Sequence, residues 1–120
     1  MADSKEQRAE ALERIEEAAR TRATELSLET LELTQLSPGI GKLTNLNTLK
    51  LGYNRLTALP PEIVKLTNLT KLNLPCNQLT ALPPEIVKLT NLTKLYFHDN
   101  PGLNIPPEIL GPTWMDVLGR

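Results

Sequence analysis

LTALPPEIVKLTNLTK, residues 56–71, recurs letter for letter at residues 79–94, a shift of 23 positions. A fixed period of this length is typical of solenoid proteins, in which each repeat is one unit stacked on the next. Extending the shift in both directions predicts a degenerate unit at 23–45 and three clear units at 46–68, 69–91 and 92–110. Nearly all of the 120-residue chain after residue 22 is therefore repeat.

The aligned units share the pattern LxxLxLxxNxLxxLPPEIxxLxN. In the second unit Leu49 and Leu51 face one way and Lys50 the other, as in a short strand with one buried face. Successive strands run in the same direction and each needs a crossover, so we expect a parallel sheet of about four strands. Pro60 and Pro61 cannot donate backbone hydrogen bonds, which predicts an extended turn and then one helical or 3₁₀ turn in the crossover.

An asparagine follows the strand in the three clear units, at Asn54, Asn77 and Asn100. Its side-chain amide both donates and accepts hydrogen bonds, so stacked copies predict a ladder that joins neighbouring loops. The first unit has Leu31 at this position. Because leucine cannot make these bonds, we expect the first loop to be looser or differently bonded.

This pattern resembles the leucine-rich repeat family, and its PPEI and LTNL elements are similar to the repeats of bacterial Roco-type proteins and intracellular Ras-linked leucine-rich repeat proteins. The resemblance covers about residues 23–110. It implies an α/β fold, a short right-handed horseshoe solenoid whose concave side is a parallel sheet that binds a protein, with no catalytic residue in the motif. It also implies a small GTPase as a candidate partner. The chain itself has no GxxxxGK[ST] phosphate loop, so we do not predict that it is the GTPase.

Both ends of a solenoid need a cover, and residues 1–22 and 111–120 predict a helical cap at each end. In the first segment Leu12, Ile15 and Ala19, with Ala11 and Ala18 beside them, form an apolar stripe at helical spacing. In the second segment Trp114 is available to cover the last repeat. We therefore expect one domain made of a cap helix, the repeats and a C-terminal cap.

Composition limits the partners and the compartment. The net charge of −1 and the lack of a basic block argue against nucleic-acid binding. There is no apolar run of about 18 residues and no signal peptide in MADSKEQRAE, which predicts no membrane segment and a cytoplasmic protein. The single Cys76 agrees with a reducing compartment. We expect a monomer without a cofactor.

The candidate binding surface is the concave side, whose residues differ between units while the crossovers of the second and third units are identical. Strands lie about 4.8 Å apart, so side chains from different units make one patch. The candidate residues are Lys50, Tyr53, Lys71, Asn73, Cys76, Lys94, Tyr96, His98 and Asp99. Tyrosines are frequent anchors of protein interfaces. Because the charge grades from Glu25 and Glu29 to the later lysines, we predict a protein partner of acidic or mixed charge.

Two alternatives follow from the same residues. Cys76, His98 and Asp99 fall at neighbouring outward positions of adjacent repeats, where they could form an activated thiol or hold zinc. An open sheet offers no pocket or oxyanion hole, so we predict neither an enzyme nor a metal site. The alternative function is a structural scaffold or an isolated repeat fragment of a larger Roco-type protein, with no ligand of its own. The identical copies indicate a recent duplication or consensus-based engineering, and the irregular segments 33–41 and 96–107 favour the duplication.

Overall fold

A computed structural model describes residues 5–103 of the chain, and all structural statements below refer to these residues. The elements are α1 (Lys5–Thr21), β1 (Glu25–Ser27), η1 (Pro38–Lys42), β2 (Thr48–Lys50), η2 (Pro61–Lys65), β3 (Lys71–Asn73), η3 (Pro84–Lys88) and β4 (Lys94–Tyr96), where η denotes a 3₁₀ helix. The last part of the fourth repeat and the C-terminal cap expected at 111–120 lie outside the described residues.

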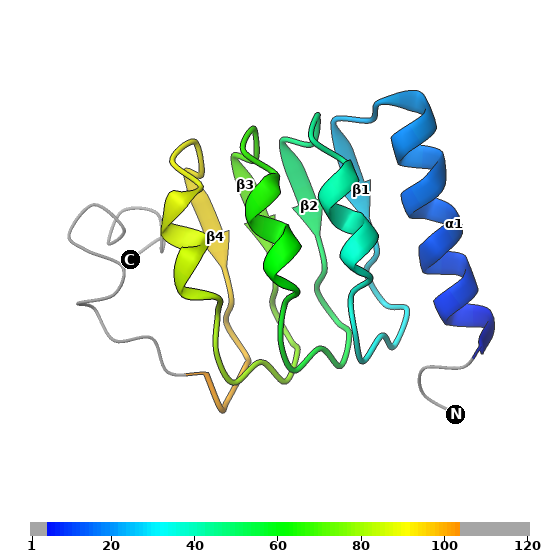
Figure 1. The fold of residues 1–120 in the computed structure, drawn as a ribbon. Helices are drawn as coiled ribbons and strands as arrows, with labels where there is room; N and C mark the ends of the chain where they lie inside the picture. Colours follow the sequence, from blue (N-terminus) through cyan, green and yellow to red (C-terminus); the bar gives the residue numbers. More distant parts are fainter. Residues whose placement is uncertain (1–4, 104–120) are drawn as a thin grey trace.

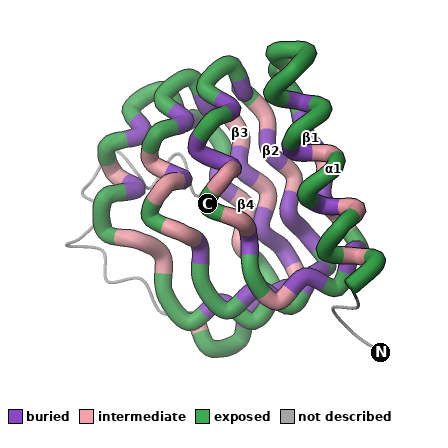
Figure 2. Tube along the Cα trace, turned by 45° about the vertical axis from the view of Figure 1, so that its right-hand side comes forward, coloured by how far each residue is buried: buried purple, intermediate pink, exposed green. Residues whose placement is uncertain are grey.

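The four strands form one parallel sheet in the order β1-β2-β3-β4 (Figure 1). The register follows the sequence period, because each strand residue pairs with the residue 23 positions on, as in Leu49 with Leu72 and Leu72 with Leu95. These leucines are buried between the sheet and the crossovers, where Figure 2 shows the buried segments of the chain. The predicted parallel sheet with one leucine-lined face is confirmed.

The crossovers contain the expected 3₁₀ turns, and each begins at a proline. In η2 the chain enters through Pro60 in an extended conformation, and the helix ends where the Leu66 N–H donates to the carbonyl of Ile63 at 3.1 Å. Ile63 and Leu66 are fully buried, so one short turn supplies two core residues. In the first unit Ser37 replaces the proline, and its hydroxyl accepts a hydrogen bond from the Gly39 N–H at 3.1 Å.

The asparagine ladder is present and extends backwards by one unit. The Asn77 amide donates to the carbonyls of Leu51, Leu74 and Pro75 at 3.0, 3.2 and 3.3 Å, and its oxygen accepts from the Leu56 N–H at 3.0 Å. Each ladder residue thus joins the end of its own strand to the loop before it. Because each ladder asparagine bonds the loop of the preceding unit, the first loop also receives hydrogen bonds from an asparagine.

Asn54 bonds the first loop, although that unit lacks an asparagine of its own. Its Oδ1 accepts from the N–H groups of Leu31 and Leu33 at 3.1 and 3.0 Å. Its Nδ2 donates to the Leu28 carbonyl at 2.9 Å. The replacement of asparagine by Leu31 therefore leaves the first loop bonded from the next unit, which is the second of the two expected outcomes, a differently bonded loop.

Helix α1 packs beside β1 and covers the first repeat (Figure 1). Its buried residues are Ala11, Ile15 and Ala18, which all belong to the predicted stripe, whereas Ala19 is exposed and Leu12 is 49% exposed. Small side chains on this face allow the helix to approach the core closely. Among the described residues, no helix combines the length and apolar character that a bilayer-spanning segment requires.

Arg14 of α1 closes the outer edge of the sheet. The carbonyls of Lys50, Asn73 and Tyr96 each accept a hydrogen bond from the preceding unit. Ser27 in β1 has no preceding unit, and its carbonyl accepts instead from Nη1 of Arg14 at 3.0 Å. A guanidinium thus satisfies the backbone where a further strand would otherwise be needed.

Candidate protein-binding face

The surface of the sheet that faces away from the leucines is formed by the first and third residues of each strand. We call it the concave sheet face; it consists of Glu25, Ser27, Thr48, Lys50, Lys71, Asn73, Lys94 and Tyr96. Of the predicted binding residues, Lys50, Lys71, Asn73 and Tyr96 lie here half-buried and Lys94 lies exposed. The structure therefore brings five of the nine predicted residues onto one continuous strand surface.

The lysines of this face are not equivalent. Nζ of Lys50 lies 3.2 Å from Oε2 of Glu25, so its charge is compensated within the sheet. Lys71 and Lys94 are register partners on adjacent strands, and no acidic side chain among residues 5–103 forms an ion pair with either. Like charges directly opposite each other destabilise a sheet. This pair therefore concentrates uncompensated positive charge on the last two strands.

Asn73 occupies the middle of the face, in register with Lys50 on one side and Tyr96 on the other. Its carbonyl oxygen Oδ1 is buried and accepts no hydrogen bond from the described residues. A buried acceptor without a partner costs about 1–3 kcal/mol. The face therefore carries a polar group that the fold does not satisfy.

Tyr53, Cys76 and Asp99 lie beyond the strands rather than on them. The strands end three positions earlier, and these residues have φ angles of 60°, 59° and 61°, in the left-handed region. Thr30 at the same position of the first unit has φ 62°. A β-branched residue rarely adopts this conformation. The sequence predicted that these side chains lie on the strands with the other binding residues. In the structure the chain instead turns at these positions and brings the next residue, the ladder asparagine, into the loop.

These residues and His98 make a second row of contacts, which we call the outer line. The thiol of Cys76 donates to Oδ2 of Asp99 at 3.8 Å, and Nδ1 of His98 lies 2.9 Å from the same oxygen. The hydrogen bond with His98 holds the pKa of the Asp99 carboxyl below its ordinary value. The neighbouring Cys76 sulfur, by its charge and by a hydrogen bond, raises the pKa of the Tyr53 phenol.

The contacts of the outer line bear on the nucleophile and zinc alternatives. Both Cys76 and His98 contact Asp99, so the ring nitrogen Nδ1 of His98 is directed at a carboxylate and not at the thiol that a Cys–His pair requires. Within residues 5–103 there is no group of three or more His, Cys, Asp and Glu side chains placed to hold a metal ion. The arrangement favours a polar surface over a reactive centre.

A packed pair separates the concave sheet face from the outer line in the two middle units. Gly52 and Pro75 occupy equivalent positions and are both buried. A Cβ atom on Gly52 would lie 3.0 Å from Cγ of Pro75, closer than side chains ordinarily approach. In these two units the predicted surface is therefore divided into two strips, with backbone and a proline ring between them.

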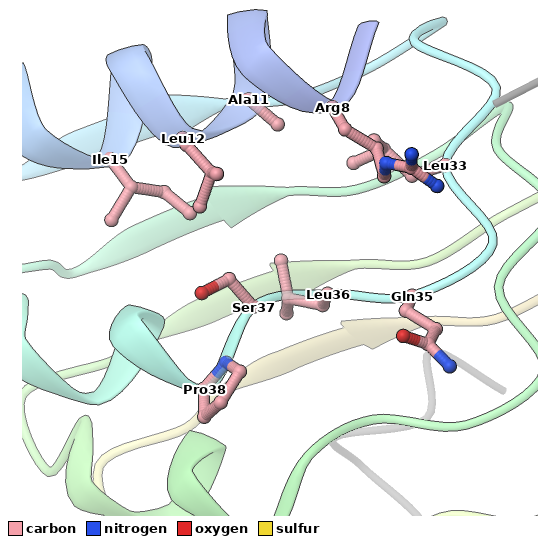
Figure 3. A pocket seen from close by; sticks show the side chains of 9 residues that line it. All are labelled: Arg8, Ala11, Leu12, Ile15, Leu33, Gln35, Leu36, Ser37 and Pro38. Carbon is pink, nitrogen blue, oxygen red and sulfur yellow. The ribbon is translucent and has the colours of Figure 1, made fainter. Parts of the chain in front are cut away.

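A groove between α1 and the first repeat is one feature that the sequence did not predict. It has a volume of about 270 Å³ and is bordered by Leu12 and Ile15 of the helix and by Leu36 and Pro38 across from them (Figure 3). Arg8 lies at one end of it (Figure 3). Leu12 was the available sequence signal for this groove, because it is a large apolar residue next to the buried Ala11 and Ile15 and is not itself buried.

Two other features were also missed. Arg14 could have been found as a cation within the apolar stripe of α1, between Ala11 and Ala18. The unpartnered oxygen of Asn73 has no sequence signal, because it depends on the side chains that surround it.

Comparisons with known proteins agree with this geometry. The family described as Leucine Rich repeats (2 copies) matches residues 44–84 and 67–107, which together cover more than half of the chain. Among solved structures, a leucine-rich repeat protein of Leptospira interrogans is similar, with 38% sequence identity, a TM-score of 0.61 and 73% of this chain covered. The match spans 26% of that longer protein. The comparison with curated proteins found no match. With its 23-residue period, parallel sheet and asparagine ladder, the chain belongs to the leucine-rich repeat family.

Proposed function

We propose that this protein is an interaction module that binds a protein partner through its concave sheet face and has no catalytic activity of its own. Leucine-rich repeat domains generally mediate protein–protein interaction, which supports the class of function. The partner and the face used by this chain are the new part of the proposal.

One observation carries the choice of face. The crossovers at residues 58–66 and 81–89 are identical, whereas the outward strand residues change from Thr48 and Lys50 to Lys71 and Asn73 and then to Lys94 and Tyr96. Identity in the crossovers is explained by common origin and by packing. Variation at outward positions, which the core does not restrict, is where a repeat protein can acquire its own specificity.

Charge extends the proposal to the kind of partner. The uncompensated Lys71 and Lys94 favour an acidic or mixed-charge protein that docks over the later repeats, with Tyr96 as an aromatic contact. The similarity of the PPEI and LTNL repeats to Roco-type and Ras-linked proteins makes a small GTPase the first partner class to test. Cys76 as the single cysteine supports a monomer in a reducing, cytoplasmic compartment.

The test is capture of partners on the immobilised chain, followed by titration of each purified partner. The intact chain is compared with the double variant Lys94→Glu, Tyr96→Glu, whose folding is checked by circular dichroism. The matched control is Lys88→Glu, which reverses the charge of an exposed lysine in η3. We expect a partner that binds the intact chain and the control and loses at least about tenfold in affinity with the double variant.

The rival proposal, a scaffold or isolated repeat fragment without a ligand of its own, predicts a different result. The match to only 26% of a longer repeat protein is the observation that favours it. Under this alternative, no protein is retained, or the same proteins are retained by the intact chain and the double variant. Either result would contradict the concave-face proposal.

A further inference from the structure

The concave sheet face is narrow. Its strands have three residues each, so the sheet extends about 10 Å along the strands and about 14 Å from β1 to β4. A stable contact between two folded domains needs about 800 Å² on each side. The face is therefore too small for a domain surface by itself, and its dimensions suit a short extended segment of chain that crosses the strands.

Two features of the concave sheet face, a lysine pair and an asparagine, lack interaction partners, and each suits a different ligand group. The register partners Lys71 and Lys94 have no counter-ion among residues 5–103, so an anion bound at this position would meet two uncompensated positive charges. Lysine ammonium groups present point charges that attract either a carboxylate or a phosphate. Since aspartate and glutamate carboxylates are the anions that an unmodified peptide chain carries, we assign the anion as a carboxylate.

The second unmet interaction is the acceptor Oδ1 of Asn73, two residues after Lys71 on the same face of β3. The terminal torsion of asparagine is soft, so the amide turns toward a ligand at low cost. A primary amide presents one acceptor and two donors, which complement the N–H and C=O of a peptide unit. A peptide backbone is therefore the ligand group that satisfies Asn73.

The two requirements meet in one ligand. We propose that the concave sheet face binds an extended peptide segment whose aspartate or glutamate carboxylate is held between the Lys71 and Lys94 ammonium groups and whose backbone pairs with the Asn73 amide. Tyr96, the register partner of Asn73, contacts the adjoining residue of the peptide. This inference rests on the proposed function, and it specifies the partner as an acidic linear segment.

The experiment is a titration of the ¹⁵N-labelled chain with the peptide acetyl-Gly-Gly-Glu-Gly-Gly-amide, followed by NMR. The glutamine version of the same peptide differs by a single charge. We expect millimolar binding of the glutamate peptide, with shifts centred on Lys71, Asn73, Lys94 and Tyr96, and binding of the glutamine peptide weaker by about fivefold or more. Raising the salt concentration should weaken the first and leave the second nearly unchanged.

The chain offers a matched control for the loss of two positive charges. Lys65 and Lys88 are exposed on η2 and η3 with the same 23-residue spacing as Lys71 and Lys94. The double variant Lys71→Gln, Lys94→Gln should weaken the glutamate peptide by about fivefold or more, while Lys65→Gln, Lys88→Gln should leave it unchanged. Equal losses in both double variants would show non-specific attraction by net charge and overturn the proposal.

The remaining outcomes separate this inference from the proposed function. Absence of shifts at tens of millimolar peptide overturns the peptide site, and so does a phosphoserine peptide that binds more than about tenfold tighter than the glutamate peptide. If a captured partner still depends on Lys94 and Tyr96 in those cases, only the inference fails. If the peptide binds as expected but capture is insensitive to the same variants, the proposed function fails instead.

Discussion

Asn77 and Asn73 lie four residues apart in one repeat, and their side chains have opposite environments. Asn77 is buried and makes hydrogen bonds with both ends of its amide, to Leu51, Leu74 and Pro75 carbonyls and from the Leu56 N–H. Asn73 has a buried oxygen that the described residues leave without a partner. The same amide is thus a structural element in the loop and an unsatisfied group on the sheet.

The difference separates what the repeat requires from what it tolerates. Asn54, Asn77 and Asn100 stand at one position of every clear unit, because each amide bonds both its own strand end and the loop of the preceding unit. The position of Asn73 holds Ser27, Lys50 and Tyr96 in the other units, so the fold sets no residue there. Departures from the interactions that stabilise a fold are expected where a protein functions. This contrast agrees with the proposal that the concave sheet face binds a partner while the ladder stabilises the fold.

The largest effect that this contrast predicts is for Asn77→Ala. The variant leaves the Leu56 N–H without its partner and removes one of the two hydrogen bonds that each of the Leu51, Leu74 and Pro75 carbonyls accepts. We expect a loss of about 4 kcal/mol in the free energy of unfolding. Guanidinium unfolding followed by circular dichroism measures it. The control is Asn68→Ala, whose amide donates to the Thr44 carbonyl at an exposed site and should cost no more than about 1 kcal/mol. Equal costs in both variants would remove the structural role assigned to the ladder.

The next effect compares the two faces of β3. Leu72 is fully buried, and Leu72→Ala should cost about 3 kcal/mol through lost burial and the resulting cavity. Its neighbour Lys71 points to the concave sheet face, opposite Lys94. Lys71→Ala relieves a like-charge contact and should change stability by less than about 0.5 kcal/mol. A loss above about 1 kcal/mol for Lys71→Ala in the same unfolding experiment would mean that the face also supports the fold.

The sequence predicted the ladder and the leucine core because both recur with the 23-residue period. The alternation of apolar residues within a unit and the shift of 23 between units were enough to predict the places of Leu49 and Leu72 in the core and of Asn54 and Asn77 in the ladder. The site was predicted less well. The columns of Lys71 and Lys94, and of Asn73 and Tyr96, are confirmed as sheet neighbours, but their role in binding stays a prediction.

Other parts of the surface were mispredicted because they depend on the path of the chain after the strand. Tyr53 and Cys76 were placed on strands, whereas their left-handed φ angles turn them onto the outer line. Gly52 and Pro75, which follow β2 and β3, pack on each other. A regular period does not reveal where a three-residue strand ends, and no pattern indicates which oxygen will be left unpaired.

A smaller effect of opposite sign is expected for Asn73→Val. The substitution removes the unsatisfied acceptor and adds a residue favourable in strands, so the free energy of unfolding should rise by about 1 kcal/mol. The control is Thr48→Val on the same face of β2, where no buried acceptor is removed and the change should stay within about 0.5 kcal/mol. Under the peptide inference the Asn73 variant also loses affinity for the glutamate peptide. A gain in stability with unchanged affinity for the glutamate peptide would show that Asn73 takes no part in binding the peptide.

The smallest effect concerns Asp99 on the outer line, which is part of neither the asparagine ladder nor the concave sheet face. The hydrogen bond with His98 lowers the pKa of the folded Asp99 carboxyl, so as the pH falls the unfolded chain takes up this proton first. The stabilising contribution is therefore complete above the ordinary carboxyl pKa and is lost as the pH falls through the lower, folded value.

Unfolding measured at a series of pH values between about 2.5 and 5.5 tests this. The difference in stability between the unsubstituted chain and Asp99→Asn should be greatest at the upper end of the range and shrink toward the lower end. Glu13→Gln, an exposed acid on α1, controls for the loss of one negative charge. A difference that is constant across the range would show that the His98 contact does not hold the carboxylate, and that the outer line contributes packing but no charge pairing to the fold.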